Sequence, residues 1–185
     1  MLHFDAMKVL NIPNIITFIR IVIIPVFVTA LIYRRYDYAL FLFIAAAVSD
    51  TLDGLLARIT KQKTKLGAFL DPLADKSLLV TSFILFSVYD WIPMWLTIIV
   101  ISRDLIVMLG WLSLYLIYHI TKVEPSLIGK AAIASQLILI AYALLSVNTD
   151  SIPSPVNAMF LTVAALTAAS GLQYIYRGLK QASEK

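Results

Sequence analysis

The chain has no cysteine among its 185 residues, so no disulfide, thiolate metal site or cysteine nucleophile is available to it. Charged residues are also scarce, because Asp, Glu, Lys and Arg make up 14% of the sequence while 61% of it is hydrophobic. A soluble domain carries nearer a quarter of charged residues. This composition excludes an ordinary soluble domain and indicates an integral membrane protein, and we expect no nucleic-acid partner.

Long apolar runs dominate the sequence. A membrane-spanning helix needs about 20 mostly apolar residues. Runs that meet this requirement cover residues 15–33, 38–56, 70–89, 92–118, 128–147 and 156–176. We therefore predict an all-α integral membrane protein, a bundle of six transmembrane helices formed by a single domain of residues 1–185, in which residues 1–13 are a candidate interfacial segment.

The basic residues between these runs are distributed unevenly. One set of flanks holds Lys8, Lys61, Lys63, Lys65, Lys122, Arg177, Lys180 and Lys185, whereas the opposite set holds only Arg34 and Arg35. Basic flanks stay on the cytoplasmic side of a membrane. The charge pattern thus places both termini on the cytoplasmic side. We expect a multi-pass protein of a bacterial-type inner or plasma membrane, with a polar cavity open to the cytoplasm because the charges within the apolar runs lie in the cytoplasmic half or near the midplane.

Four aspartates stand where the second and third apolar runs approach each other, namely Asp50, Asp53, Asp71 and Asp75. Carboxylates beside a bilayer are costly, so four within 26 residues indicate a functional site. Residues three or four apart share a helix face, so each pair should lie on one face and the two pairs converge if the helices face each other. Ligands that are all oxygen suit Mg²⁺ or Mn²⁺, and four exceed the need of one ion, which predicts two divalent cations.

Small and basic residues accompany the aspartates. Gly54 and Ala57 continue the stripe of the first pair, and Gly67 precedes the second pair by one turn. Side chains this small let a bulky ligand or a neighbouring backbone approach closely. Arg58 adds a guanidinium suited to phosphate oxygens. Because paired metal ions support displacement at phosphorus, the pattern favours transfer of a phosphoryl-linked group from a diphosphate at the membrane surface.

The stretch reads Asp50-x2-Asp53-Gly54-x2-Ala57-Arg58-x8-Gly67-x3-Asp71-x3-Asp75, and it resembles the signature of the CDP-alcohol phosphotransferase family at every fixed position. The resemblance implies the six-helix fold, a homodimer, and transfer of a substituted phosphate from a CDP-linked donor, usually CDP-diacylglycerol, to an alcohol with release of CMP. It implies that the four aspartates bind the metal pair, that Asp75 is the general base, and that Gly54, Ala57, Arg58 and Gly67 bind the donor.

The acceptor is indicated by residues outside the motif. Residues 11–20 and Gly129-Lys130 look like phosphatidylglycerophosphate synthases of this family, whose acceptor is glycerol 3-phosphate, and Arg20, Arg103 and Lys130 are the cations available for its phosphate. Asp104, Gly110-Trp111 and Ala132-Ile133 depart from that branch. Ser102-Arg103-Asp104 and residues 167–170 also look like the family's cardiolipin synthases, which use phosphatidylglycerol; an inositol-phosphate acceptor is a more distant third.

Two alternative interpretations involve the same charges. Arg103 and Asp104 could neutralise each other as a structural pair. The aspartates could serve an ion-coupled transporter, since membrane carboxylates often relay protons or ions. Many carriers are built from internal repeats, and no repeat of three plus three helices is visible in this sequence, which favours the enzyme.

Overall fold

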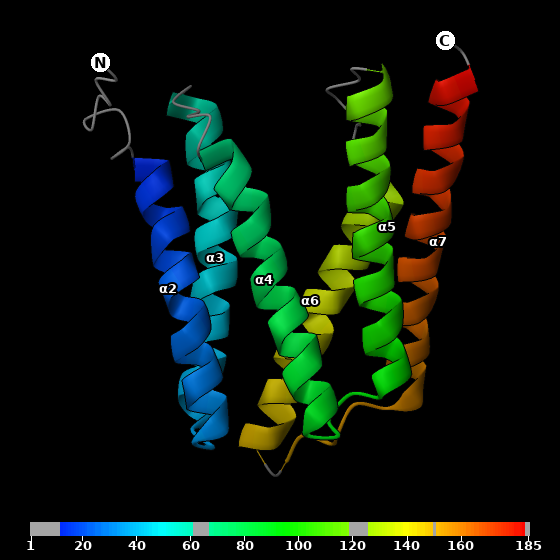
Figure 1. The fold of residues 1–185 in the computed structure, drawn as a ribbon. Helices are drawn as coiled ribbons and strands as arrows, with labels where there is room; N and C mark the ends of the chain where they lie inside the picture. Colours follow the sequence, from blue (N-terminus) through cyan, green and yellow to red (C-terminus); the bar gives the residue numbers. More distant parts are fainter. Residues whose placement is uncertain (1–11, 61–66, 119–125, 150, 184–185) are drawn as a thin grey trace. The chain divides into compact units, whose positions relative to one another are not determined.

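The computed structural model describes residues 12–60, 67–118, 126–149 and 151–183, and every regular element in them is an α-helix (Figure 1). The helices are α2 (Ile12–Ile32), α3 (Tyr36–Thr60), α4 (Gly67–Val88), α5 (Met94–Tyr118), α6 (Leu127–Asn148) and α7 (Asn157–Ser183). The all-α class and the six predicted helical segments are confirmed. The candidate interfacial segment lies outside the described residues, except for Ile12 and Pro13, which begin α2.

The helices fall into two compact units. The first consists of Met1–Ser82 with Val147–Asp150, and the second consists of Phe83–Ser146 with Ser151–Lys185. α2 and α3 belong to the first unit, α5 and α7 belong to the second, and α4 and α6 contribute to both.

In the first unit, α2 packs lengthwise against α3 (Figure 1). The buried side chains between them include Phe27, Leu31, Ala39, Phe43 and Ala46. The rings of Phe27 and Phe43 lie 6.2 Å apart between centroids. These residues recur every three or four positions, so each helix directs one apolar stripe at its neighbour.

A tight turn joins α2 to α3. Arg34 adopts a left-handed conformation with φ 56°, and its amide donates to Leu31 O at 3.0 Å. The amide of Arg35 donates to Ala30 O at 2.8 Å. These two bonds form a Schellman motif, which satisfies the last carbonyls of α2 and reverses the chain.

A second Schellman motif ends α4 in the second unit. Asp90 has φ 58°, and the amide of Trp91 donates to Phe86 O at 2.8 Å. The rings of Phe86 and Trp91 meet edge to face at 5.0 Å, which supplies the apolar contact that accompanies a Schellman motif. Thr97 Oγ1 then donates to Phe83 O at 3.2 Å, fixing the start of α5 against α4.

Three helices are long and apolar enough to cross a membrane over their described residues: Met94–Ser113, Leu127–Asn148 and Asn157–Lys180. The described apolar parts of the other three are shorter, namely Ile21–Ile32, Tyr36–Ser49 and Lys76–Val88. These spans and the exposed apolar side chains along them agree with an integral membrane protein.

Candidate active site

The aspartate motif occupies two helix ends in the first unit. Asp50, Asp53, Gly54, Ala57 and Arg58 lie in the C-terminal part of α3, and Gly67, Asp71 and Asp75 lie at the start of α4. Figure 1 shows these two ends at the same end of the unit. Because both segments are helical, the predicted i, i+3 and i, i+4 spacings each place a pair of aspartates on one helix face.

The rise per residue of a helix gives similar distances for the two pairs, each measured along its own helix from the end of α3 or the start of α4. Asp50 stands about 15 Å before the end of α3 at Thr60, and Asp75 about 12 Å after the start of α4 at Gly67. For Asp53 and Asp71 the corresponding distances are about 10 Å and 6 Å. On each helix, therefore, one aspartate position lies deeper and one lies nearer the helix end.

The side chains of these motif residues, and that of Arg20 in α2, are outside the part of the structure that is described. Among the side chains that are described, no group of three or more His, Cys, Asp or Glu could hold a metal ion. Convergence of the four carboxylates on metal ions therefore stays a prediction from sequence and helix register.

Arg103 belongs to the second unit, where it is buried with 6% of its surface exposed. Its Nη1 donates to Asp104 Oδ1 at 2.7 Å, and its Nη2 donates to Ser170 Oγ in α7, also at 2.7 Å. The guanidinium carbon lies 5.5 Å from the centroid of the Tyr174 ring. The ion pair considered from the sequence is thus present, and a serine and an aromatic face from a second helix complete it.

A glycine makes this approach possible. A Cβ placed on Gly171 would lie 3.3 Å from Arg103 Cγ. Larger side chains would push α7 away from α5 at this level, so the absence of a side chain sets the distance over which Arg103 reaches Ser170.

Lys130, the third predicted acceptor cation, is exposed in the first turn of α6. The turn is capped by Ser126, whose Oγ accepts a hydrogen bond of 3.0 Å from the Gly129 amide. Serine is a preferred N-cap because its oxygen satisfies an amide that the helix leaves unpaired. A Cβ on Gly129 would lie 3.4 Å from Ser170 Oγ, so the capped turn packs against α7 beside Arg103.

The second unit contains a buried polar cluster around Arg103, most of which was not predicted from the sequence. Its buried members are Ser126, Gln136, Thr167 and Ser170, with the half-buried Tyr174 beside them, and Gln136 Nε2 donates to Thr167 Oγ1 at 2.9 Å. A signal was available, since Thr167, Ser170 and Tyr174 follow each other at helical spacing along α7. The cluster ties α5, α6 and α7 together through hydrogen bonds in an apolar setting.

Comparison with known proteins places the motif in a family. Residues 10–170 match the CDP-alcohol phosphatidyltransferase family. The "Probable phosphatidylglycerophosphate synthase" of Mycobacterium tuberculosis is 34% identical over 181 residues, which cover 94% of this chain and 84% of that protein. The "CDP-diacylglycerol--glycerol-3-phosphate 3-phosphatidyltransferase" of Sodalis glossinidius is 37% identical over 179 residues, covering 90% and 94%. The "Cardiolipin synthase (CMP-forming)" of Rattus norvegicus is 34% identical over 189 residues, covering 92% and 62%.

The fold and the motif together define a helical membrane protein whose aspartate motif lies on the end of one helix and the start of the next. The family match covers most of the chain and includes the whole aspartate motif. The chain belongs to the CDP-alcohol phosphatidyltransferase family and is therefore a transferase of phospholipid synthesis.

Proposed function

We propose that this enzyme transfers the phosphatidyl group from CDP-diacylglycerol to glycerol 3-phosphate, giving phosphatidylglycerophosphate and CMP. The observation that carries the proposal is the complete aspartate pattern, placed on adjoining ends of α3 and α4 in a chain of this family. Relatives whose names state this reaction, from Sodalis glossinidius and Salmonella typhimurium, are 37% and 33% identical to the chain.

The four aspartates of the motif are suitable ligands for divalent cations. Asp50, Asp53, Asp71 and Asp75 offer oxygen ligands at two levels of neighbouring helix ends, which suits two Mg²⁺ or Mn²⁺ ions rather than zinc. When bound, such ions neutralise the negative charge that develops on the phosphate oxygens and on the departing phosphate.

The protein's own residues would position and activate the reactants. Gly54, Ala57 and Gly67 leave room for the cytidine and diphosphate, and Arg58 contacts the phosphate oxygens. Asp75 accepts the proton of the acceptor hydroxyl while the oxygen of that hydroxyl forms a bond to the phosphorus that carries diacylglycerol. The bond from that phosphorus to the bridging diphosphate oxygen breaks, and CMP leaves with the electron pair.

Binding of the acceptor phosphate is assigned to Arg20, Arg103 and Lys130. Lys130 supports this role because its side chain is exposed at the capped start of α6. Arg103 is held by Asp104 and Ser170, and its Nε has no hydrogen-bond partner among the described residues, so it retains one donor for a ligand. A cation held at this position would be oriented before the acceptor arrives.

The membrane arrangement belongs to the same proposal. Six spanning helices, with both termini and the active site on the cytoplasmic side, fit the positions of the basic residues. Because the chain lacks cysteine, single cysteine replacements can report which side of the membrane each position faces. In intact cells, a membrane-impermeant maleimide should label Asp37→Cys and leave Ala182→Cys unlabelled; the reverse pattern would invert the topology.

A homodimer is also proposed. Small residues on α7 remain exposed within the described chain, namely Thr162, Ala165, Ala168 and Ala169. Such residues allow close packing of helices in a membrane. Cross-linking of Ala165→Cys in native membranes should yield a dimer, and an exclusively monomeric product would count against this face.

The function is tested by CMP release from CDP-diacylglycerol, with purified protein and each acceptor supplied separately. Glycerol 3-phosphate with Mg²⁺ or Mn²⁺ should give CMP and phosphatidylglycerophosphate, and chelation of the metal should stop both. Absence of CMP with every polyol phosphate and with phosphatidylglycerol would refute the transferase assignment and reopen the ion-coupled transporter.

Phosphatidylglycerol is the second candidate acceptor. Relatives named "Cardiolipin synthase (CMP-forming)" from Rattus norvegicus and Homo sapiens are 34% and 33% identical to the chain. In the same assay, product formation with phosphatidylglycerol but not with glycerol 3-phosphate would favour this reaction. An inositol-phosphate acceptor is tested alongside them.

A further inference from the structure

A groove lies in the first unit, between the last turns of α2 and the first turns of α3, at the opposite end from the aspartates. Its volume is about 650 Å³, which is in the range of ligand sites. Val26, Ala30 and Phe41 contribute apolar walls. Thr29 also lines the groove, but its hydroxyl donates to Pro25 O at 2.8 Å, so this donor is already satisfied.

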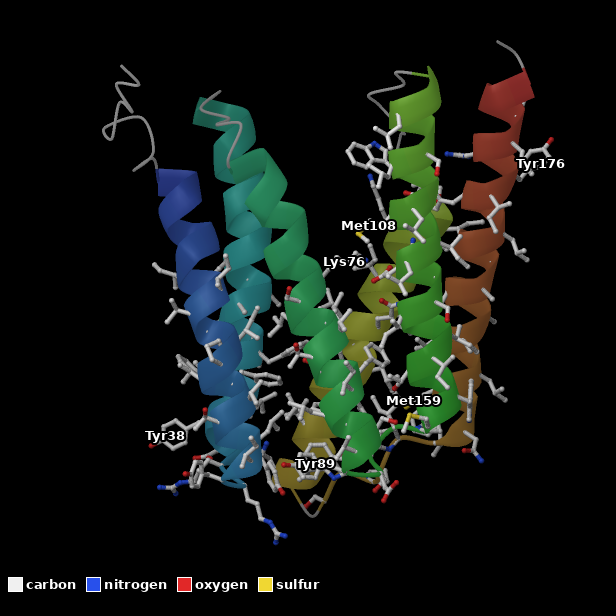
Figure 2. The ribbon with its side chains drawn as sticks, viewed as in Figure 1. Tyr38, Lys76, Tyr89, Met108, Met159 and Tyr176 are labelled. Atoms are coloured by element: carbon white, nitrogen blue, oxygen red, sulfur yellow. The ribbon has the colours of Figure 1, made fainter. Side chains whose placement is uncertain are left out.

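The mouth of the groove has a different character. Tyr33, Arg35 and Tyr38 stand there, and the guanidinium carbon of Arg35 lies 5.7 Å from the centroid of the Tyr38 ring. Both tyrosines are exposed, by 74% and 57% of their surfaces. Figure 2 shows Tyr38 projecting outward near the start of α3. Tyrosine and arginine beside an apolar surface are typical of the level of lipid headgroups.

The turn at this mouth is positively charged. Arg34 and Arg35 are both exposed, and within the described part of the chain neither forms an ion pair. Asp37, exposed in the first turn of α3, is an acidic group beside them, so residues 34–37 together carry one net positive charge. Arg34 holds φ 56°, a conformation that glycine adopts more easily, so an arginine at this position carries a conformational cost.

We propose that this groove is a binding site for an anionic phospholipid. The headgroup phosphate contacts Arg35 at the mouth, with Arg34 beside it, and one acyl chain lies against Val26, Ala30 and Phe41. This site is separate from the aspartate motif and does not depend on which acceptor the enzyme uses.

Charge complementarity and wall chemistry select this occupant. A soluble phosphate would use the arginines but not the apolar walls, whereas a zwitterionic lipid would use the walls and gain little from the net positive charge. An anionic phospholipid uses both. Each arginine near an anionic lipid surface should strengthen binding about five-fold.

The test reads lipid occupancy at the groove itself. Trp91, Trp95 and Trp111 are first replaced by Phe, and a single fluorophore is introduced by Phe41→Trp. The protein is reconstituted in phosphatidylcholine vesicles that contain a minor fraction of brominated phosphatidylglycerol or of brominated phosphatidylcholine with the same acyl chains. We expect stronger quenching by the brominated phosphatidylglycerol.

Two variants separate the headgroup contact from the groove. The double variant Arg34→Gln/Arg35→Gln should equalise quenching by the two lipids. Ala30→Phe should abolish the preference while leaving both arginines in place, because its ring fills the groove. The matched control carries its fluorophore through Ile138→Trp, an exposed site on α6, and should show no preference between the lipids.

Three results would overturn the proposal. Equal quenching by both lipids with the arginines intact would exclude a preference for anionic headgroups. A preference that survives the double Gln variant would remove the arginines from the site. Absence of quenching by either lipid would show that protein, such as a second copy of the chain, covers the groove, and the oligomeric state measured in the same vesicles would identify that case.

Discussion

The guanidinium of Arg103 in α5 and the hydroxyl of Ser170 in α7 form a hydrogen bond of 2.7 Å inside the second unit. The two residues are 67 positions apart in sequence. Asp104 neutralises the arginine from the same helix, so a charge that would be costly in an apolar setting is both paired and bonded across helices. This contact connects the packing of α5 on α7 to a side chain that we assign to acceptor binding.

Ser170→Ala should lower the stability of the protein. It removes an acceptor from a buried charged donor, for which we expect a loss of about 1–2 kcal/mol. Unfolding of purified protein in detergent measures the effect. Ser113→Ala is the control, because that hydroxyl donates to Leu109 O on an exposed part of α5, and its loss should cost less than about 0.5 kcal/mol. Equal losses would contradict a special role for the contact.

Gly171 and Gly110 form a matched pair of helical glycines. A Cβ on Gly171 would lie 3.3 Å from Arg103 Cγ, whereas one on Gly110 would meet nothing within 4 Å. Gly171→Leu should therefore separate α5 from α7 and lower stability by about 2–3 kcal/mol. Gly110→Leu should be neutral or raise stability by about 0.5–1 kcal/mol, because leucine favours the helix. Thermal unfolding of both variants decides this, and similar behaviour would refute the close packing at Gly171.

Asp75→Asn should keep the donor bound but lose turnover. An amide cannot accept the hydroxyl proton as a carboxylate does, so we expect kcat to fall by about 10²–10⁴-fold. Titration with radiolabelled CDP-diacylglycerol measures binding, and CMP release measures turnover. Retention of near-normal kcat would remove Asp75 from the role of base.

Lys130→Ala should affect the acceptor more than the donor. Loss of one charge-assisted contact to a phosphate should raise the KM for glycerol 3-phosphate about ten-fold, with a small change for CDP-diacylglycerol. Lys180→Ala removes a lysine near the end of α7 and serves as the control, with both KM values within about two-fold of the parent. Equal changes of the two KM values in Lys130→Ala would argue against a phosphate site at α6.

Local features of the chain were predicted well. The apolar runs at 92–118 and 128–147 correspond to α5 (Met94–Tyr118) and α6 (Leu127–Asn148), and the motif falls on helix in both its halves. The main differences are α3, which continues to Thr60 beyond the apolar run that ends at residue 56, and α7, which continues to Ser183 beyond the run that ends at residue 176. Backbone hydrogen bonding continues a helix past the point where its side chains become polar, so an apolar run underestimates its length.

Partners between helices were predicted poorly. Arg103 was considered with its neighbour Asp104, but Ser170, Gly171 and Tyr174 were not assigned to it. Gln136 and Thr167, 31 positions apart, were not paired either. In membrane helices apolar residues occupy most faces, so the sequence pattern does not state which face of one helix meets another.

The sequence by itself determined the class of protein, the helices and the order of the aspartates along them, because hydrophobic length and helical spacing are local properties. The tertiary structure decided which side chains hold Arg103, why a side chain at position 171 would contact Arg103, and that Arg35 lines an apolar groove. Those features depend on how each helix is rotated against its neighbour. That rotation is set by packing between residues distant in the chain.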